Sequence, residues 1–570
     1  FTNSLLVGTS STGTLSSATG NTGVGTSVLA ALTSGDRNTA IGIESMNDIT
    51  TGADNVAVGN NSLDETTTGT NNTAVGGYSL SENTTASGNT AVGNVSLYCN
   101  TTGANNTAVG FCSLRANTTA DKNTAVGYSS LLVNTTGTRN TAVGFCSLQA
   151  NTTGDDNTAF GTESLRANTT GANNVAVGKN ALVANTTGDE NTAVGCNTLG
   201  ANTTADNNTA IGAFALDTNT EGHSNVAVGR SALTANTTAD HNTAVGFSAL
   251  DTNTTGAHNV AVGSRAGDAN TTGTQNTFVG GDYNGGPGGA NTTGGCNTFI
   301  GNDSGMKNTT GSFSTSVGAE SSCNGTTSHS NAALGYKALK LLTTGNSNVA
   351  IGREAMISNT TGGASIGVGA YALQNNTTGC SHVAIGLQAL EDSTTGENNV
   401  AIGRTAAKDV TTGTKNIMVG FNSGSNATTG TGNVLIGDSA GTDAVRNVTT
   451  GSNNIVLGNN ASATAHIKID WTVTSDLRDK TEVKNVTHGL DFVNQITPIE
   501  YRFKKSREND TPTGNKKYGF KAQEILALEG DNPIIINNDD TDNLKLTSAH
   551  LIPVLVNAIK ELKAEIELLK

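Results

Sequence analysis

The stretch Asn-Thr-Ala-Val-Gly at positions 106–110 recurs through most of the chain and decides its fold. The closing glycines follow each other in 17-residue steps from Gly8 to Gly280 and, after one 21-residue step, from Gly301 to Gly437. A second 21-residue step leads to the last copy, so the chain holds 27 copies. A short, fixed period indicates one structural unit that stacks on copies of itself.

Each unit reads N-T-A-V-G-x-x-S/A-L-x-x-N-T-T-G-x-x and predicts one coil of a β-solenoid. The Thr and Val of Thr-Ala-Val share one face of a strand and Ala takes the other, while Leu, four residues after the glycine, is a second buried anchor. N-T-T-G or N-T-T-A closes a turn in which Gly supplies unusual backbone angles. We expect two short strands and two corners per coil, with parallel neighbours about 4.8 Å apart and a shaft roughly 130 Å long.

Composition fits a mostly β shaft. The 570 residues include 71 Gly but only 5 Pro, and aliphatic residues at fixed positions argue against a disordered chain. Pro287 is the only proline before Ser475, and it lies inside a 21-residue step. Such scarcity is expected because a parallel ladder needs its N–H donors.

The strand residues that flank the central Ala predict association between chains. The interior positions are mostly small and enclose little apolar area, and the flanking Thr, Val and Ile point away from that interior. Three chains packed around an axis would cover them and add buried area that a thin rod lacks. We therefore expect a homotrimer in preference to a monomeric solenoid.

Charge and hydropathy exclude several partners. The net charge is −15 and no basic patch carries interleaved aromatic residues, so nucleic-acid binding is not expected. No run of apolar residues approaches the length of a transmembrane helix, so membrane insertion is not expected either. Residues 3–8 already form a degenerate repeat, and a signal peptide or an anchoring domain is expected before them.

Cysteine and histidine spacing indicates neither a metal nor a cofactor. Cys112 and Cys146 share one slot two coils apart, about 9.6 Å on the ladder spacing, which is too far for a disulfide. No C-x-x-C spacing occurs, and small buried side chains are the favoured interpretation of the seven cysteines. His241 and His258 are one repeat apart and could stack in one column. Solvent-exposed corner residues are the favoured interpretation of this pair, ahead of a metal site.

Asparagine lies four residues before the closing glycine in 23 of the 27 copies. Stacked asparagines can hydrogen-bond along a ladder. The N-T-T triplets, such as those at Asn117 and Asn151, are also glycosylation sequons. The ladder is the favoured interpretation because glycans about 4.8 Å apart would crowd each other. A threonine ice-binding face is disfavoured because no flat Thr-only face can be isolated.

The repeat resembles the N-T-A-V-G/N-T-T-G repeats of trimeric viral and phage fibres, and also the head β-roll of trimeric autotransporter adhesins. Its only insertions are four residues each. Because a polysaccharide-degrading spike needs a domain or long loops to build a cleft, that activity is disfavoured.

Three segments are expected: the repetitive shaft over 1–458, an extended connector over 459–474 that contains Trp471, and a small α+β domain over 475–570. In the last segment we expect a short helix over 489–493, a strand over 498–503, a second helix beginning at 518–525 and short strands over 533–536 and 544–546.

The helix expected over 550–570 carries a heptad seam. Isoleucine at many seam positions favours more than two strands, which predicts a trimeric coiled coil. Such a coiled coil would hold three shafts in register, since a slip of one chain by a single repeat satisfies almost the same contacts. The seam residues are Ile552, Leu555, Ile559, Leu562, Ile566 and Leu569.

The segment 475–570 is similar to the C-terminal intramolecular chaperones of endosialidases and other phage tail fibres. The matching stretches are S-D-L-R-D-K at 475–480, G-L-D-F-V at 489–493, P-I-E-Y-R-F at 498–503, G-F-K-A-Q-E-I at 519–525 and L-I-P-V-L-V-N-A-I-K-E-L at 551–562. Members of that family trimerise, drive folding of the fibre and then cut themselves off.

The resemblance implies a Ser–Lys dyad, with Ser475 as nucleophile, Lys480 as its base and Thr474–Ser475 as the scissile bond. A partly desolvated lysine has a lowered pKa and can accept the hydroxyl proton. Asp476 and Arg478 are expected to orient the site. The enzyme activity expected is a single self-cleavage without turnover.

The resemblances together imply an extracellular virion fibre that contacts a host receptor or glycan and is released from its own chaperone once. A segment before the repeats is expected to bind other virion proteins. The alternative is a cell-surface trimeric adhesin with the same shaft. A virion-docking domain or a secretion signal before the repeats would discriminate the two.

Overall fold

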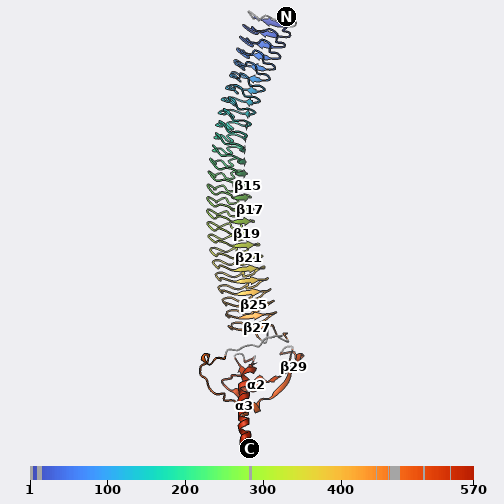
Figure 1. The fold of residues 1–570 in the computed structure, drawn as a ribbon, viewed down its shortest axis with the longest axis vertical. Coiled ribbons are helices and arrows are strands. Elements are labelled where there is room, and N and C mark those ends of the chain that lie inside the picture. The colour runs from blue at the N-terminus through green and yellow to red at the C-terminus, as the bar shows by residue number, and fades with distance from the viewer. Residues whose placement is uncertain are drawn as a thin grey trace. The chain divides into compact units, whose positions relative to one another are not determined.

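The computed structural model describes residues 4–8, 16–281, 285–443, 446–459, 461–462, 475–504, 507–538, 541–542 and 544–570. The chain divides into two compact units, one formed by 1–441 with 448–456 and one by 442–447 with 457–570. The first unit is the solenoid (Figure 1). The connector expected over 459–474 lies, apart from 459 and 461–462, outside the described residues, and so does Trp471.

A parallel ladder of three-residue strands builds the solenoid. Each copy of Thr-Ala-Val forms one strand, and each strand from β1 to β25 pairs in parallel with the next, as Thr107 does with Thr124. All 27 strands belong to one sheet, which confirms the parallel β-solenoid predicted from the period. The strands are β1 (Leu5–Val7), β2 (Thr22–Val24), β3 (Thr39–Ile41), β4 (Val56–Val58), β5 (Thr73–Val75), β6 (Thr90–Val92), β7 (Thr107–Val109), β8 (Thr124–Val126), β9 (Thr141–Val143), β10 (Thr158–Phe160), β11 (Val175–Val177), β12 (Thr192–Val194), β13 (Thr209–Ile211), β14 (Val226–Val228), β15 (Thr243–Val245), β16 (Val260–Val262), β17 (Thr277–Val279), β18 (Thr298–Ile300), β19 (Thr315–Val317), β20 (Ala332–Leu334), β21 (Val349–Ile351), β22 (Ile366–Val368), β23 (Val383–Ile385), β24 (Val400–Ile402), β25 (Ile417–Val419), β26 (Val434–Ile436) and β27 (Ile455–Leu457).

The second strand expected in each coil is absent from the described coils. The residues after the closing glycine form turns in which every second residue has a left-handed backbone, such as Cys112 at φ 56° and Leu114 at φ 51°. Their N–H groups still reach neighbouring coils, because Cys112 donates to the Asn94 carbonyl at 3.2 Å and Leu114 to the Ser130 carbonyl at 2.9 Å. This side of the coil therefore hydrogen-bonds to the neighbouring coils, although its backbone is not extended.

The closing glycine is required by both its backbone and its surroundings. Gly110 has φ 137°, and a Cβ there would lie 2.4 Å from the carbonyl oxygen of Gly127 in the next coil. The glycine of N-T-T-G has no positive φ, contrary to expectation, which is why Ala120 can fill the same position. The left-handed residue of that corner comes two positions later, as at Asn105 after Gly103.

The interior of each coil is filled by one small and one large side chain. Ala108 and Leu114 are fully buried, and their equivalents in other coils form two core clusters along the solenoid, one from Ala18 to Phe299 and one from Ala333 to Val448. Both positions were predicted as buried anchors, and both are confirmed.

Two buried asparagine ladders satisfy the polar groups of the interior. In the ladder four residues before the glycine, Asn106 Oδ1 accepts from the Asn123 backbone N–H at 2.9 Å, and its Nδ2 donates to the Ala120 carbonyl at 2.9 Å. In the N-T-T ladder, Asn117 Nδ2 donates to Asn100 Oδ1 at 2.7 Å. Asn106 and Asn117 are completely buried, so a glycan cannot be attached to Asn117, the sequon asparagine, in the folded coil.

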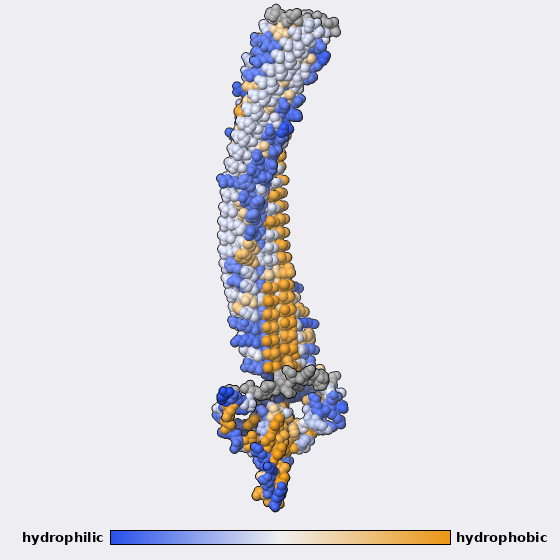
Figure 2. All heavy atoms as spheres, viewed as in Figure 1, coloured by the Kyte–Doolittle hydropathy of each residue, from blue (hydrophilic) through white to orange (hydrophobic). Residues whose placement is uncertain are grey.

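The two strand positions that flank the buried Ala point outward and form two parallel columns, which we call the outer columns. They hold the first and third residue of each strand, such as Thr107 and Val109, and are half-buried or exposed in β2–β26. Figure 2 shows them as an apolar band along the C-terminal part of the solenoid. The single chain therefore leaves uncovered the face that the sequence predicted to need a partner.

The remaining predictions about single residues have mixed outcomes. All seven cysteines are free, but only Cys146 and Cys323 are buried, so the interpretation as small buried side chains is wrong for the other five. The rings of His241 and His258 stack with centroids 5.1 Å apart, as predicted from their spacing. Among the described helices, none is both long and apolar enough to cross a membrane.

The second unit contains three α-helices and two small antiparallel sheets among its described residues: the 3₁₀ turn η1 (Leu477–Asp479), α1 (Leu490–Gln495), β28 (Pro498–Lys504), β29 (Pro512–Phe520), α2 (Ala522–Glu529), β30 (Ile536–Asn537), β31 (Lys545–Leu546) and α3 (Ser548–Leu568). The helix expected from 518 begins only at Ala522, because residues up to Phe520 pair with β28. Strand β29 was not predicted.

In four coils the large interior side chain stands at the strand position and a glycine stands at the position that is Leu in most coils. Phe299 replaces the strand Ala, and in the same coil Gly305 replaces the Leu. A Cβ on Gly305 would lie 2.6 Å from the Phe299 ring, so the aromatic ring occupies the space that leucine fills elsewhere. Phe278 with Gly288, Met418 with Gly424 and Leu435 with Gly441 follow the same rule.

We expect Gly305→Leu and Phe299→Ala each to destabilise the shaft, by overpacking and by leaving a cavity, at a cost of about 3 kcal/mol each. Gly305 already has the left-handed φ that leucine adopts at this position, so the double variant restores the common Ala and Leu pair. Its unfolding midpoint in a denaturant titration should return close to that of the parent. Additive losses in the double variant would contradict the exchange.

His382 is the only fully buried histidine in the described residues and takes the place of an asparagine in the first ladder. Its Nδ1 accepts from the Asn399 backbone N–H at 3.4 Å. Burial lowers the pKa of the His382 imidazole from 6.5 to about 4.

Because the unfolded chain binds a proton at His382 below pH 6.5 and the folded chain does not, shaft stability should fall as the pH drops from 6.5 to 4. The loss is about 3 kcal/mol per chain. His382→Asn restores the ladder residue and should remove this part of the pH dependence. Thermal unfolding of both proteins at pH 7 and pH 4.5 measures the difference, and equal pH dependence would contradict the assignment.

Candidate functional site

Ser475 and Lys480 lie together at the start of the second unit. Lys480 Nζ is 2.9 Å from Ser475 Oγ and donates also to the Ser475 carbonyl oxygen at 3.1 Å. Both residues are exposed in the single chain. The geometry places an amine within proton-transfer distance of a hydroxyl, the arrangement that a Ser–Lys nucleophile requires. Thr474, the other residue of the expected scissile bond, lies outside the described residues.

Asp476 and Arg478 hold the turn that brings Lys480 back to Ser475. Asp476 Oδ1 caps η1 by accepting from the Arg478 N–H at 2.9 Å, and the Arg478 guanidinium binds the same carboxylate, with Nη2 2.5 Å from Oδ2. The Lys480 N–H then donates to the Leu477 carbonyl at 3.1 Å and closes the turn. The Arg478 side chain, helped by its backbone N–H, lowers the pKa of the Asp476 carboxyl. The four predicted site residues thus form one turn, while their catalytic roles stay predictions.

Helix α3 presents two apolar faces. Leu551, Val554 and Ala558 are buried in the core of the unit, together with Phe492 of α1 and Ile525 of α2. The heptad seam lies on another face and is exposed at every position, between 44% at Leu555 and Leu562 and 88% at Leu569. An exposed apolar seam of this length is a candidate surface for packing against another chain.

Polar residues of α3 also bind α1, and the sequence did not reveal them. Glu561 Oε2 accepts from the Leu490 N–H at 2.6 Å, at the N-terminus of α1. Asn557 Nδ2 donates to the His488 carbonyl at 3.1 Å and to Glu561 Oε1 at 2.9 Å. These partners are far apart in the chain, and a single sequence carries no signal for such a pair. The contact ties α3 to the segment that follows the Ser–Lys turn.

A second unpredicted carboxylate orders the loop after α2. Glu529 Oε1 accepts from the N–H groups of Ile534 and Ile535 at 2.8 and 2.7 Å, and its Oε2 accepts from Ile536 at 2.9 Å. Three backbone donors on one carboxylate fix the approach to β30 and place Ile535 and Ile536 in the core.

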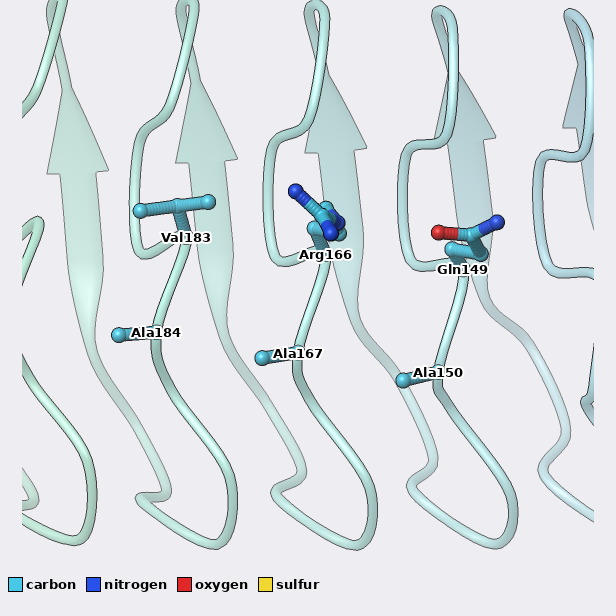
Figure 3. A pocket seen from close by; sticks show the side chains of 6 residues that line it. All are labelled: Gln149, Ala150, Arg166, Ala167, Val183 and Ala184. Carbon is cyan, nitrogen blue, oxygen red and sulfur yellow. The ribbon is translucent and has the colours of Figure 1, made fainter.

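The shallow pocket in Figure 3 lies on the wall of the solenoid and carries no acid pair. Gln149, Arg166 and Val183 line up in one column, and Ala150, Ala167 and Ala184 form a second column beside it. Glycoside hydrolysis uses a pair of carboxyl groups flanking the bond. None of the six lining residues is a carboxylate, so this pocket offers no site for that reaction.

We expect Glu561→Ala to lower the free energy of unfolding of the second unit by about 2 kcal/mol, because the Leu490 N–H loses a charged acceptor. Hydrogen–deuterium exchange of α1 in the full chain should become faster. Glu565→Ala, one turn further along α3 and exposed, is the matched control and should leave α1 unchanged. Equal exchange in both variants would contradict a stabilising role for this contact.

Comparison with known protein families gives one match. Residues 475–531 match the family model described as chaperone of endosialidase, over a range that contains the Ser–Lys turn, α1, α2 and the β28–β29 hairpin. No curated protein matches the chain in sequence. The chain thus combines a β-solenoid shaft of 17-residue coils with an endosialidase-type chaperone segment, the two parts of a tail-fibre-like protein.

Proposed function

We propose that three copies of this chain form a fibre that a virion displays for attachment to a host receptor or glycan. The segment 475–570 would assemble the trimer, set the register of the three shafts and then release itself by cutting the Thr474–Ser475 bond. The observation that carries the proposal is the short contact between Lys480 Nζ and Ser475 Oγ inside a segment that matches the chaperone family.

Two exposed apolar surfaces support the homotrimer. The outer columns run along the solenoid, and the seam of α3 repeats with heptad spacing. A second copy of the chain has outer columns with the same coil spacing and a seam with the same heptad spacing. An unrelated globular protein would need apolar side chains that repeat at the spacing of the coils. Isoleucine at three of the six seam positions favours more than two helices.

The proposed cleavage is a single acyl transfer followed by hydrolysis. Lys480 Nζ would accept the proton of Ser475 Oγ as that oxygen attacks the Thr474 carbonyl carbon. The C–N bond to Ser475 breaks, the serine nitrogen takes up a proton, and an ester joins Thr474 to Ser475 Oγ. Water then hydrolyses the ester and leaves a carboxylate on Thr474 and a free amine on Ser475. Asp476 and Arg478 would act as positioning residues because they shape the turn without touching either reacting atom.

A long repetitive rod supports a role in attachment because it can extend from the virion surface. The pocket on its wall carries no acid pair, so it gives no support to a hydrolase role. A cell-surface adhesin is the second candidate, because the same solenoid would serve on a cell, but the match to the endosialidase chaperone favours the virion. A polysaccharide-degrading spike is the least favoured, and incubation with capsular glycan tests it.

Self-cleavage should appear as a separate band for residues 475–570 on denaturing electrophoresis of freshly expressed protein. Ser475→Ala should abolish the band, and Lys480→Met, which keeps the length of the side chain but removes the amine, should do the same. Asp476→Ala should slow its appearance about tenfold by loosening the turn, equivalent to about 1.4 kcal/mol in the barrier.

Thr513→Ala, on β29 and remote from the turn in sequence, is the control and should cleave like the parent. Retention of the band in Ser475→Ala would rule out the dyad, and a parent that stays uncut as a trimer would limit the segment to a chaperone role.

A further inference from the structure

The outer columns are not uniform along the solenoid. The column of third strand residues is aliphatic almost throughout, whereas the column of first residues changes character near β20. In β5–β10 that first residue is threonine in every strand, and in β21–β26 it is valine or isoleucine in every strand. Both outer columns are therefore apolar in every strand of β21–β26, the part of the solenoid nearest the chaperone segment in sequence, whereas a first-position valine occurs in single strands such as β11, β14 and β16 earlier in the shaft.

The apolar side chains of this part are accessible in the single chain. The isoleucines at Ile351, Ile366 and Ile385 are 38–40% exposed, and Ile402, Ile417 and Ile436 are 38–42% exposed. Figure 2 shows the result as a broad apolar band in the C-terminal part of the solenoid, which narrows toward the N-terminus. None of these side chains is needed to fill the coil interior, which other buried residues of the same coils occupy, namely Ala350, Met356, Leu373, Ala384, Leu390, Ala401, Ala407, Met418 and Leu435.

We infer that β21–β26 form the clamp that holds the three shafts together, and that the threonine-rich coils before β20 contribute much less to the contact between copies. The occupant of the clamp is a second copy of this chain, so the inference rests on the homotrimer proposed above. A double column of Val and Ile that repeats with every coil is matched in spacing by the identical double column of another copy in register.

The clamp would keep the three chains together after the chaperone segment is released. When residues 475–570 leave, the coiled-coil seam of α3 leaves with them, and the chains need another contact to stay together. The coils next to the cut in sequence carry the most apolar outer columns, so the trimer would remain closed at this end. Threonine at the first position further along exposes a hydroxyl, whose burial between chains costs free energy unless it is hydrogen-bonded.

Valine-to-threonine substitutions test the clamp because the two side chains have nearly the same shape and differ by a hydroxyl. The clamp variant is Val383→Thr, Val400→Thr and Val434→Thr together. The matched control is Val175→Thr, Val226→Thr and Val260→Thr, which changes the same first strand position in β11, β14 and β16. All six side chains are half-buried or exposed, so neither variant alters the coil interior.

The measurement is the rate at which differently labelled full-length trimers exchange chains on warming, followed by energy transfer between the labels. The chaperone segment is the same in all proteins, so a difference between the variants reports the position in the shaft. We expect the clamp variant to exchange at least tenfold faster than the parent and the control to exchange within about twofold of it, a tenfold change corresponding to about 1.4 kcal/mol.

Equal acceleration in both variants would overturn the clamp and leave the homotrimer intact, whereas a monomeric parent would remove the proposed trimer itself. Circular dichroism at the same temperatures shows whether the coils persist. If the clamp variant loses its β-sheet signal before it exchanges chains, the columns stabilise the single coil and the inference fails. The reverse set, Thr107→Val, Thr124→Val and Thr141→Val, should slow exchange.

Discussion

The contact between one coil and the next is the constraint on which the whole shaft depends. Each residue of a coil lies over its equivalent in the following repeat, and the backbone N–H groups, the asparagine amides and the interior Leu and Ala all find their partners there. Buried amide groups are costly unless they are hydrogen-bonded, so a coil is stable only between two neighbours of nearly identical sequence. This requirement explains why Asn117 and Gly110 recur with so little variation, and why the positions that do vary lie on the outside.

The same uniformity creates a difficulty when several chains align. Within each part of the shaft, neighbouring coils present nearly the same outer columns, so a chain displaced by one coil makes almost the same contacts as a chain in register. The seam of α3 is an apolar surface outside these coils, on a helix that lies C-terminal to the range matched by the endosialidase chaperone model, residues 475–531. The fold of the segment 475–570, with Glu561 and Asn557 holding α1 to α3, presents a defined helix on which three chains could align before the coils pair.

The structural features that follow from the repeat period could be predicted from the sequence. Those that depend on local backbone conformation or on contacts between residues far apart in the chain could not. The strands at Thr-Ala-Val, their parallel register, the buried Ala and Leu, and the helices and the β28 strand of the second unit follow from hydrophobic spacing and composition. The alternating left-handed residues, such as Cys112 and Leu114, could not be predicted because side-chain periodicity does not distinguish a laddered turn from a strand. For the candidate site, motif resemblance identified Ser475 and Lys480, and the turn held by Asp476 and Arg478 explains their proximity.

The dependence of shaft register on the segment 475–570 is tested most directly by native mass spectrometry of the shaft, residues 1–474, produced with and without that segment attached. With the segment attached, the account predicts one species of three chains, whether or not the segment is afterwards cut off. Without it, the shafts should form a spread of staggered assemblies and single chains. Uniform three-chain particles of the shaft made without the segment would contradict the account, because the repeats would then have chosen their own alignment.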